Sequence, residues 1–312
     1  MASVANFNIS PSPLAPVFGL VTVTATGASQ DVTVTMTCDG TSYTDTRSPK
    51  SGAVAFDIAP YLRAFFAGAS ATTRLKVVTV KVAHGAQATD YTLYALFASS
   101  SPAFPLGAPI TQRIYTAYPK QKFTLLADTT NKTFAVYNKQ GVATTYNLNT
   151  GYNDLTASEY LTDGCTVYYK SYAYKFIADA CDCGLMFKWI DRQGFIRYFM
   201  LQEGEMTTTT KDKSENIYST ESHTTPLGTF RTEQTYPVGF EMEVTKKYCA
   251  TFSTEEDRKL LETIYTAQYV WMVDKEDNGQ RVKIKRGKVS TAKGLQDFEI
   301  EVVLPAPQGL SV

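Results

Sequence analysis

The sequence predicts a mainly β protein, built from two antiparallel β-sandwich or half-barrel modules that each carry one short amphipathic helix. Its 312 residues include 20 Tyr and 17 Phe, aromatic types that are enriched in strands. Charged residues make up 19% and hydrophobic residues 44%, so enough apolar side chains are present for a substantial core. Short runs that alternate apolar and polar residues recur towards both ends of the chain, and this period of two indicates half-buried strands.

The first module is expected over residues 1–105. Residues 20–37 alternate apolar residues and Thr on both sides of a Gly-Ala-Ser-Gln-Asp turn, so they predict a β-hairpin. A further strand is expected at 53–57. The stretch 57–66 predicts a short helix, because its first Asp can cap it, Pro60 falls in the first turn and its apolar residues share one face.

Two strands at 75–82 and 91–97, joined by a turn that holds His84, complete this module. Ser, Pro and Gly then concentrate between residues 99 and 111, which indicates a domain boundary or a long connection. The second module is therefore expected over residues 106–312.

The second module is expected to contain strands separated by one polar stretch. The hairpin with the strongest signal joins 185–190 to 195–201 across an Asp-Arg-Gln-Gly turn. Residues 206–235 are polar and Thr-rich without periodicity, so we expect an arm or an insertion that orders against a partner. The remaining expected strands are 122–126, 133–138, 166–170, 240–249, 269–273, 282–285 and 298–304.

The helix of this module is expected after Ser253-Thr-Glu-Glu256, a capping box in which the Ser253 hydroxyl serves the N3 amide and Glu256 reaches back to the N-cap N–H. Its apolar stripe comprises Leu260, Leu261, Ile264 and Tyr265. The tripeptide Asp277-Asn278-Gly279 predicts a tight turn with a positive φ at the Gly.

Few residues suit metal binding or catalysis. His84 lies in a turn and His223 in the polar arm, and neither has a carboxylate or nucleophile at a telling distance in the sequence, so both are expected to be solvated. Residues 274–279 resemble the start of a calcium-binding EF-hand loop, but Lys285 stands at the twelfth position, where a bidentate Glu is required. We expect a hairpin turn there.

The cysteines form a poor disulfide framework, because they are odd in number and scattered along a chain with no secretory signal. Cys181 and Cys183 are closely spaced, but not as C-x-x-C, and a metal would need two further ligands from elsewhere. We expect buried apolar thiols. The full set is Cys38, Cys165, Cys181, Cys183 and Cys249.

Paired carboxylates and tryptophans have structural interpretations as well. Glu203 and Glu205, and likewise Glu241 and Glu243, are two residues apart, so in strands each pair shares one face, which we expect to be a wet face above a core rather than a glycosidase site. Both tryptophans, Trp189 and Trp271, lie in apolar strand runs, so a core position is favoured over a sugar-binding groove. No catalytic, cofactor-binding or metal-binding residue is predicted, and no enzyme.

The charge balance argues against binding to nucleic acid through charge alone, because 30 Lys and Arg residues are matched by 30 Asp and Glu residues. The N-terminal MASVANFNIS has neither a basic segment nor an apolar one, and no run reaches the length of a transmembrane helix. We therefore expect folding in a cytoplasm and no membrane partner.

One long motif carries a family resemblance. Residues 183–199 (CGLMFKWIDRQGFIRYF) resemble the C-G-x-x-φ-R-W-I-x-R-x-G-x-x-x-Y-W hairpin of tail-associated structural proteins from phages and prophages of Bacteroides-like bacteria. As in those proteins, a Thr-rich stretch, a strand ending in K-x-C, a capped helix and a closing strand at 295–305 follow, so the resemblance covers roughly 181–307. Lys188 and Phe199 replace the usual Arg and Trp of the pattern.

The resemblance implies a tail-tube-like fold and a virion protein of the distal-tail or baseplate-hub type, made in the host cytoplasm. Such a subunit is expected to form a homo-oligomeric ring and to dock onto other tail proteins, without cofactors and without sequence-specific nucleic acid. The alternative left open by the aromatic residues is a carbohydrate-binding β-sandwich used in host-surface adhesion.

Overall fold

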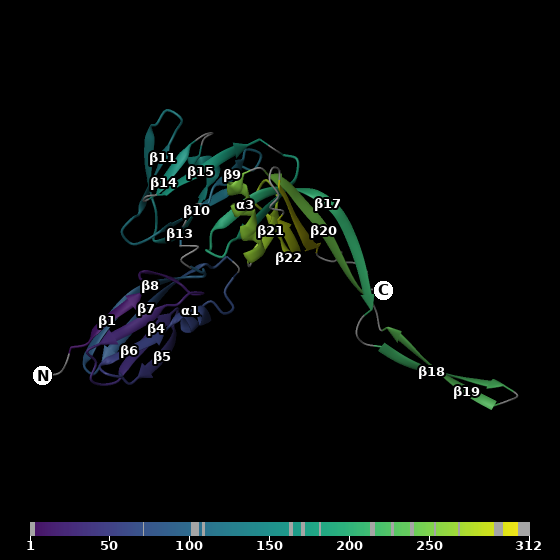
Figure 1. The fold of residues 1–312 in the computed structure, drawn as a ribbon, viewed down its shortest axis with the longest axis horizontal. Coiled ribbons are helices and arrows are strands. Elements are labelled where there is room, and N and C mark those ends of the chain that lie inside the picture. Colours follow the sequence, from purple (N-terminus) through teal and green to yellow (C-terminus); the bar gives the residue numbers. More distant parts are fainter. Residues whose placement is uncertain are drawn as a thin grey trace. The chain divides into compact units, whose positions relative to one another are not determined.

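In the computed structural model, the mainly β prediction is confirmed: several sheets, a six-strand barrel and three short α-helices are found in the described residues (Figure 1). The described residues are 4–70, 72–100, 106–107, 110–161, 165–169, 172–180, 182–212, 216–225, 228–237, 240–252, 254–267, 269–289 and 296–304. No helix within these ranges combines the length and the apolar character needed to span a membrane.

The chain divides into two compact units, each made of two chain segments. The first unit consists of Met1–Phe199 and Thr254–Gln280, and the second of Met200–Ser253 and Arg281–Val312. The sequence-based division into residues 1–105 and 106–312 stays a prediction.

The first unit begins with a sandwich of two sheets. The smaller sheet has the antiparallel order β1 (Asn6–Ser10), β3 (Thr22–Thr26) and β6 (Ala53–Asp57). The larger has the order β2 (Leu14–Pro16), β8 (Gln87–Leu96), β7 (Leu75–His84), β4 (Val32–Cys38) and β5 (Thr41–Arg47). In this sheet β2 runs parallel to β8. The short helix α1 (Ala59–Ala64) forms as expected, and the Asp57 carboxylate accepts the Ala59 N–H at 3.0 Å.

The predicted hairpin at 20–37 is wrong in its pairing, although both of its strands form. β3 lies in the smaller sheet and β4 in the larger, so the turn between them crosses from one sheet to the other. Val23 of β3 and Val34 of β4 are both fully buried in the same core. The alternating pattern predicts which face of a strand is buried, but it does not identify the neighbouring strand, and this explains the error.

His84, which was expected to be solvated, is buried beneath this crossing turn, with 6% of its surface exposed. Its Nε2 accepts hydrogen bonds from the backbone N–H groups of Ser29 at 3.0 Å and Gln30 at 3.1 Å. The imidazole thus supplies an acceptor to two backbone amides of the turn, and it fixes the connection between the two sheets.

Replacing His84 with Ala is expected to lower the free energy of unfolding by about 1–2 kcal/mol, because two backbone donors lose their acceptor. The unfolding midpoint in urea measures this effect. Lys81→Ala, an exposed position on the same strand, is the control and is expected to change little. Equal midpoints for the two variants would contradict the role given to the imidazole.

The rest of the first unit contains two further sheets over one aromatic core. One has the order β12 (Ala143–Asn147), β11 (Thr133–Tyr137), β14 (Thr166–Tyr169), β15 (Tyr172–Asp179) and β9 (Gln112–Tyr115), and the other pairs β10 (Lys122–Ala127) with β13 (Gly151–Thr156). The helix α2 (Ala157–Tyr160) follows β13. Phe123 and Phe134, with ring centroids 6.5 Å apart, are buried in the core that these sheets share. The predicted strands at 122–126, 133–138 and 166–170 are confirmed.

Six strands close into a barrel in the order β16 (Leu185–Ile190), β17 (Ile196–Asp212), β20 (Phe240–Phe252), β23 (Gln296–Leu304), β22 (Gly279–Val289) and β21 (Tyr269–Val273). The hairpin predicted around residues 191–194 is confirmed as β16 and β17. The predicted strands of the C-terminal part also form, as β20, β21, β22 and β23.

The helix α3 (Glu255–Glu262) forms as predicted and continues into the 3₁₀ helix η1 (Thr263–Thr266), but its cap is shifted by one residue. Thr254 is the N-cap, and its side-chain oxygen accepts the Asp257 N–H at 3.2 Å. Ser253, the predicted cap, lies outside the described residues. Two adjacent hydroxyl residues both satisfy the capping pattern, so the sequence did not decide between them.

The polar stretch 206–235 contains more regular structure than its lack of periodicity indicated. β17 continues through it to Asp212, which pairs with Phe240 of β20. β18 (Asn216–Thr225) and β19 (Gly228–Pro237) then pair antiparallel and form a two-stranded sheet of their own (Figure 1). Its many threonines are compatible with strands, because β-branched side chains favour the extended backbone.

Candidate functional site

The cysteines follow the prediction in part. Cys38 and Cys165 are buried thiols and Cys249 is a half-buried thiol. Cys183, in contrast, is disulfide-bonded, so the expectation of a reduced thiol is wrong at this position. Cys181 lies outside the described residues. The spacing of Cys181 and Cys183 was compared only with metal-binding and redox motifs. It does not show whether a cysteine can reach a partner with the geometry of a disulfide.

Glu203 and Glu243, one member of each predicted carboxylate pair, form solvent-accessible ion pairs in the second unit. Glu203 forms an ion pair with Lys246 at 2.5 Å, and Glu243 forms one with Lys285, also at 2.5 Å. The expected wet face above a core is not found at Glu203 and Glu205, because residues 202–208 are exposed on both faces of the strand and a β-bulge interrupts the pairing between Glu203 and Met206. The side chains of Glu241 and His223 lie outside the described part of the chain. Groups of three or more His, Cys, Asp or Glu that could hold a metal are not found among the described residues.

The stretch 274–279 is a hairpin turn between β21 and β22, and the first of its three acidic residues, Asp274, accepts hydrogen bonds from the backbone of the turn. Asp274 accepts the N–H groups of Glu276 and Asn278, both at 2.9 Å, and the hydrogen bonds from Asn278 hold the pKa of Asp274 below its usual value. The positive φ lies at Asp277, at 63°, and not at Gly279 as predicted. A Cβ at Gly279 would lie 3.1 Å from Trp271 Cβ, so close packing against β21 accounts for that Gly.

The two tryptophans have different environments. Trp189 is fully buried, as predicted, and its indole N–H donates to Thr263 Oγ1 at 2.8 Å. Trp271 is only half-buried, so its assignment to the core is corrected: it stacks on Tyr269 with ring centroids 5.9 Å apart and lines a pocket of the first unit.

This pocket encloses about 310 Å³, and all of its lining residues belong to the first unit. Its apolar wall is formed by Ile190, Ile196, Trp271 and Val273. Its polar lining residues come from segments that are far apart in the sequence and are Thr72, Arg74, Lys122, Asp154, Lys188 and Asp277. The lining therefore holds three basic groups and two carboxylates, a formal excess of one positive charge.

Both carboxylates of the pocket are paired with a basic group. Arg74 donates to Asp154, and the Thr124 hydroxyl donates to the same carboxylate at 2.7 Å. Lys188 Nζ lies 2.6 Å from Asp277.

Tyr198 extends the second of these pairs, because its hydroxyl donates to Asp277 at 3.2 Å. Burial and, next, the charge of Asp277 raise the pKa of Tyr198, so this phenol stays protonated and remains a donor. Lys122 is the one basic residue of the lining for which the described residues supply no ion-pair partner.

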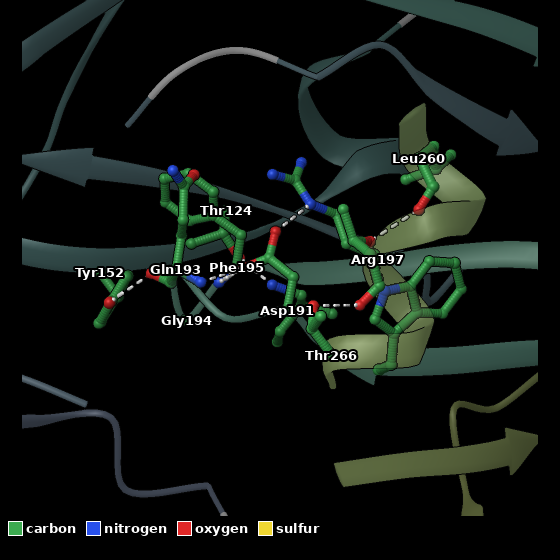
Figure 2. Close-up of polar contacts among 12 residues, drawn as sticks. Thr124, Tyr152, Asp191, Gln193, Gly194, Phe195, Arg197, Leu260 and Thr266 are labelled. Atoms are coloured by element: carbon green, nitrogen blue, oxygen red, sulfur yellow. Dashed lines mark hydrogen bonds and ion pairs between the residues drawn. The ribbon is translucent and has the colours of Figure 1, made fainter. Parts of the chain in front are cut away.

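A buried turn joins Ile190 to Ile196, two residues that line the pocket, and Figure 2 shows the polar contacts of this turn. Asp191, 4% exposed, accepts the backbone N–H groups of Gln193 at 2.8 Å and Phe195 at 3.0 Å, and it accepts Nε–H of Arg197 at 2.8 Å. Arg197 itself is 1% exposed. The carboxylate thus fixes the conformation of the turn and compensates a buried guanidinium at the same time.

The same turn attaches the barrel strands to the N-terminal sandwich. Arg74 donates to the Gly194 carbonyl oxygen, and its guanidinium carbon lies 4.7 Å from the ring centroid of Tyr152. The Tyr152 hydroxyl donates to the Gln193 carbonyl at 2.7 Å, and burial raises the pKa of Tyr152. Arg74 therefore contacts the turn and also lines the pocket, so a change in the turn would shift a lining residue of the pocket.

Sequence reasoning assigned no binding role to any polar residue of this pocket, although Lys188 was noted in the hairpin motif and Asp277 in the predicted turn. Lys122 was included in a predicted strand, but nothing marked its side chain, and Arg74 and Asp154 fell outside the expected elements. The one available signal was charge in otherwise apolar strands, at Lys122 and Lys188. A comparison of the chain with protein-family models and with curated proteins finds no match.

Proposed function

We propose that this chain is a structural subunit of a phage tail, of the distal-tail or baseplate-hub type, which acts by self-assembly and by docking onto neighbouring tail proteins. It would be made in the host cytoplasm and work in the virion, without an enzymatic activity. The hairpin motif at residues 183–199 supports this function by resemblance, and the observation that carries the proposal is the β18–β19 hairpin.

β18 and β19 pair with each other, from Asn216 with Pro237 to Thr225 with Gly228, and the described strands include no third member of their sheet. An isolated two-stranded hairpin is marginally stable in water, because it has no sheet face or helix to pack against. A second copy of the chain, or a neighbouring tail protein, would supply that packing and convert a weak element into an assembly contact.

A patch of exposed apolar side chains in the five-stranded sheet supports assembly independently. Tyr137 and Tyr168 form an edge-to-face pair with centroids 5.1 Å apart, and they are 38% and 46% exposed. Val142, next to the same strands, is 61% exposed. Clustered exposed apolar groups of this kind are typical of protein–protein contacts.

Deletion of residues 216–237, with a Gly-Ser linker in their place, is expected to abolish self-association while leaving the rest of the chain folded. Light scattering coupled to size exclusion should show an oligomer for the intact chain and a monomer for the deletion variant. The control inserts the same linker at Gly141, in the exposed turn between β11 and β12, and should keep the oligomer. An intact chain that stays monomeric at high concentration would contradict the proposal.

A carbohydrate-binding role in host-surface adhesion is the second candidate, favoured by the half-buried Trp271 in the lining of a pocket that also contains charged and polar residues. Aromatic side chains and a few polar groups converging on a concave site are typical of small-ligand recognition. This candidate and the first are compatible, because adhesion and assembly can use different surfaces.

A further inference from the structure

We propose that the Trp271 pocket binds a carboxylated sugar, with the sugar ring against Trp271 and the carboxylate on Lys122. The inference rests on the second candidate function and names its ligand class, and it is independent of tail assembly. The volume of about 310 Å³ lies at the lower end of ligand pockets, which suits one or two sugar residues rather than a larger molecule.

The apolar wall explains why the ligand needs a ring with an apolar face. Ile190, Ile196 and Val273 line the pocket together with Trp271, so these four side chains offer dispersion contacts and few hydrogen bonds. Lys188, the cross-strand neighbour of Trp271, adds a polar group beside the indole. A sugar ring presents C–H groups to such a wall and directs its hydroxyls away from it. Trp271 keeps its place because it stacks on Tyr269 and packs closely against Gly279.

The two carboxylates explain why the ligand needs hydroxyl groups. A carboxylate has about four acceptor positions, and the described partners of Asp154 and Asp277 leave some of them for ligand donors. The hydroxyl groups of a sugar can donate to these oxygens.

Lys122 explains why the ligand needs one negative charge. Arg74 and Lys188 are each paired within the pocket, so Lys122 is the basic group left to compensate an incoming anion. Its side chain is only half-buried, so its ammonium group can meet a ligand without a costly rearrangement. A single carboxylate on the sugar would convert the formal charge of the lining from an excess of one to neutrality.

The test titrates the full chain with sodium glucuronate, glucose and sodium acetate, and follows binding by calorimetry and by tryptophan fluorescence. We expect glucuronate to bind in the millimolar range, and glucose and acetate at least about tenfold more weakly. The fluorescence change should disappear in Trp271→Phe, because the remaining Trp189 is fully buried away from ligand. Lys122→Gln should weaken glucuronate binding about tenfold, and Lys120→Gln, an exposed neighbour on the same segment, should not.

Each contrary outcome has a distinct meaning. If glucose binds as tightly as glucuronate, the role of the carboxylate is wrong but carbohydrate binding stands. If acetate binds as tightly as glucuronate, the sugar ring makes no contribution and the ligand class is wrong. Absence of glucuronate binding overturns the inference, and an array of neutral and acidic glycans without hits would then remove the second candidate function as well. The oligomeric state of the intact chain and of the hairpin deletion decides the tail-subunit proposal separately.

Discussion

Gly194→Ala is expected to lower the stability of the first unit by about 3–5 kcal/mol, or to prevent its folding. The residue has a φ of 81°, a backbone conformation that costs a Cβ-bearing residue about 1–2 kcal/mol. A Cβ at this position would in addition lie 2.3 Å from the hydroxyl oxygen and 2.6 Å from Cζ of Tyr152. Overpacking of this kind costs about 1–3 kcal/mol, and a displaced hydroxyl loses its hydrogen bond to Gln193 as well.

The control for this variant is Gly141→Ala, which isolates the backbone contribution. Gly141 has a φ of 78° and no atom within 4 Å of an added Cβ, so we expect a loss of about 1 kcal/mol. The fluorescence of the buried Trp189 during urea unfolding reports on the first unit in both variants. Similar midpoints for the two substitutions would show that Tyr152 yields easily and that the turn is not tightly fixed.

Asp191→Asn is expected to be the second strongly destabilising change, by about 3–5 kcal/mol, because it leaves the guanidinium of Arg197 buried without a counter-charge. Asn can still accept the turn amides through Oδ1, so the loss reports on the charge pair and not on the shape of the turn. Urea unfolding of the single variants and of the double variant measures the coupling between the two residues.

The double variant Asp191→Asn/Arg197→Met should recover most of the stability, because both buried charges are then absent. Nη2 of Arg197 has no hydrogen-bond partner among the described residues, so removal of this guanidinium sacrifices little bonding. Glu255→Gln, which disrupts an exposed ion pair with Arg258, is the control and should leave the midpoint nearly unchanged. A double variant as unstable as Asp191→Asn alone would assign the effect to packing.

The strands of this protein could be predicted well where alternation is regular, but their partners could not. β4 buries every second side chain from Val32 to Cys38, and the sequence predicts its buried face correctly. Its true neighbours, β5 and β7, lie on either side in a sheet that the alternation does not specify. β12, in contrast, is mostly exposed and carries no periodic signal, so it was missed.

The pocket was beyond prediction for a related reason. Arg74, Lys122 and Trp271 come from three separate elements, and only tertiary structure brings them to one cavity. His84 shows the same limitation on a smaller scale, because its buried position depends on a turn at Ser29, which lies 55 residues away in the sequence. Residue type and local spacing therefore indicate which chemistry is available, and the fold decides where it is used.

The attachment of the β18–β19 hairpin has a mechanical consequence. In the chain the hairpin follows β17 and precedes β20, and these two strands meet at one common end, where Asp212 pairs with Phe240. A pulling force on it would therefore act along both strands in the same direction and would not peel them apart. The hydrogen bonds between β20 and β23, from Val244 with Leu304 to Phe252 with Gln296, run across that direction and share the load. A force on the hairpin would therefore load these hydrogen bonds together, in shear.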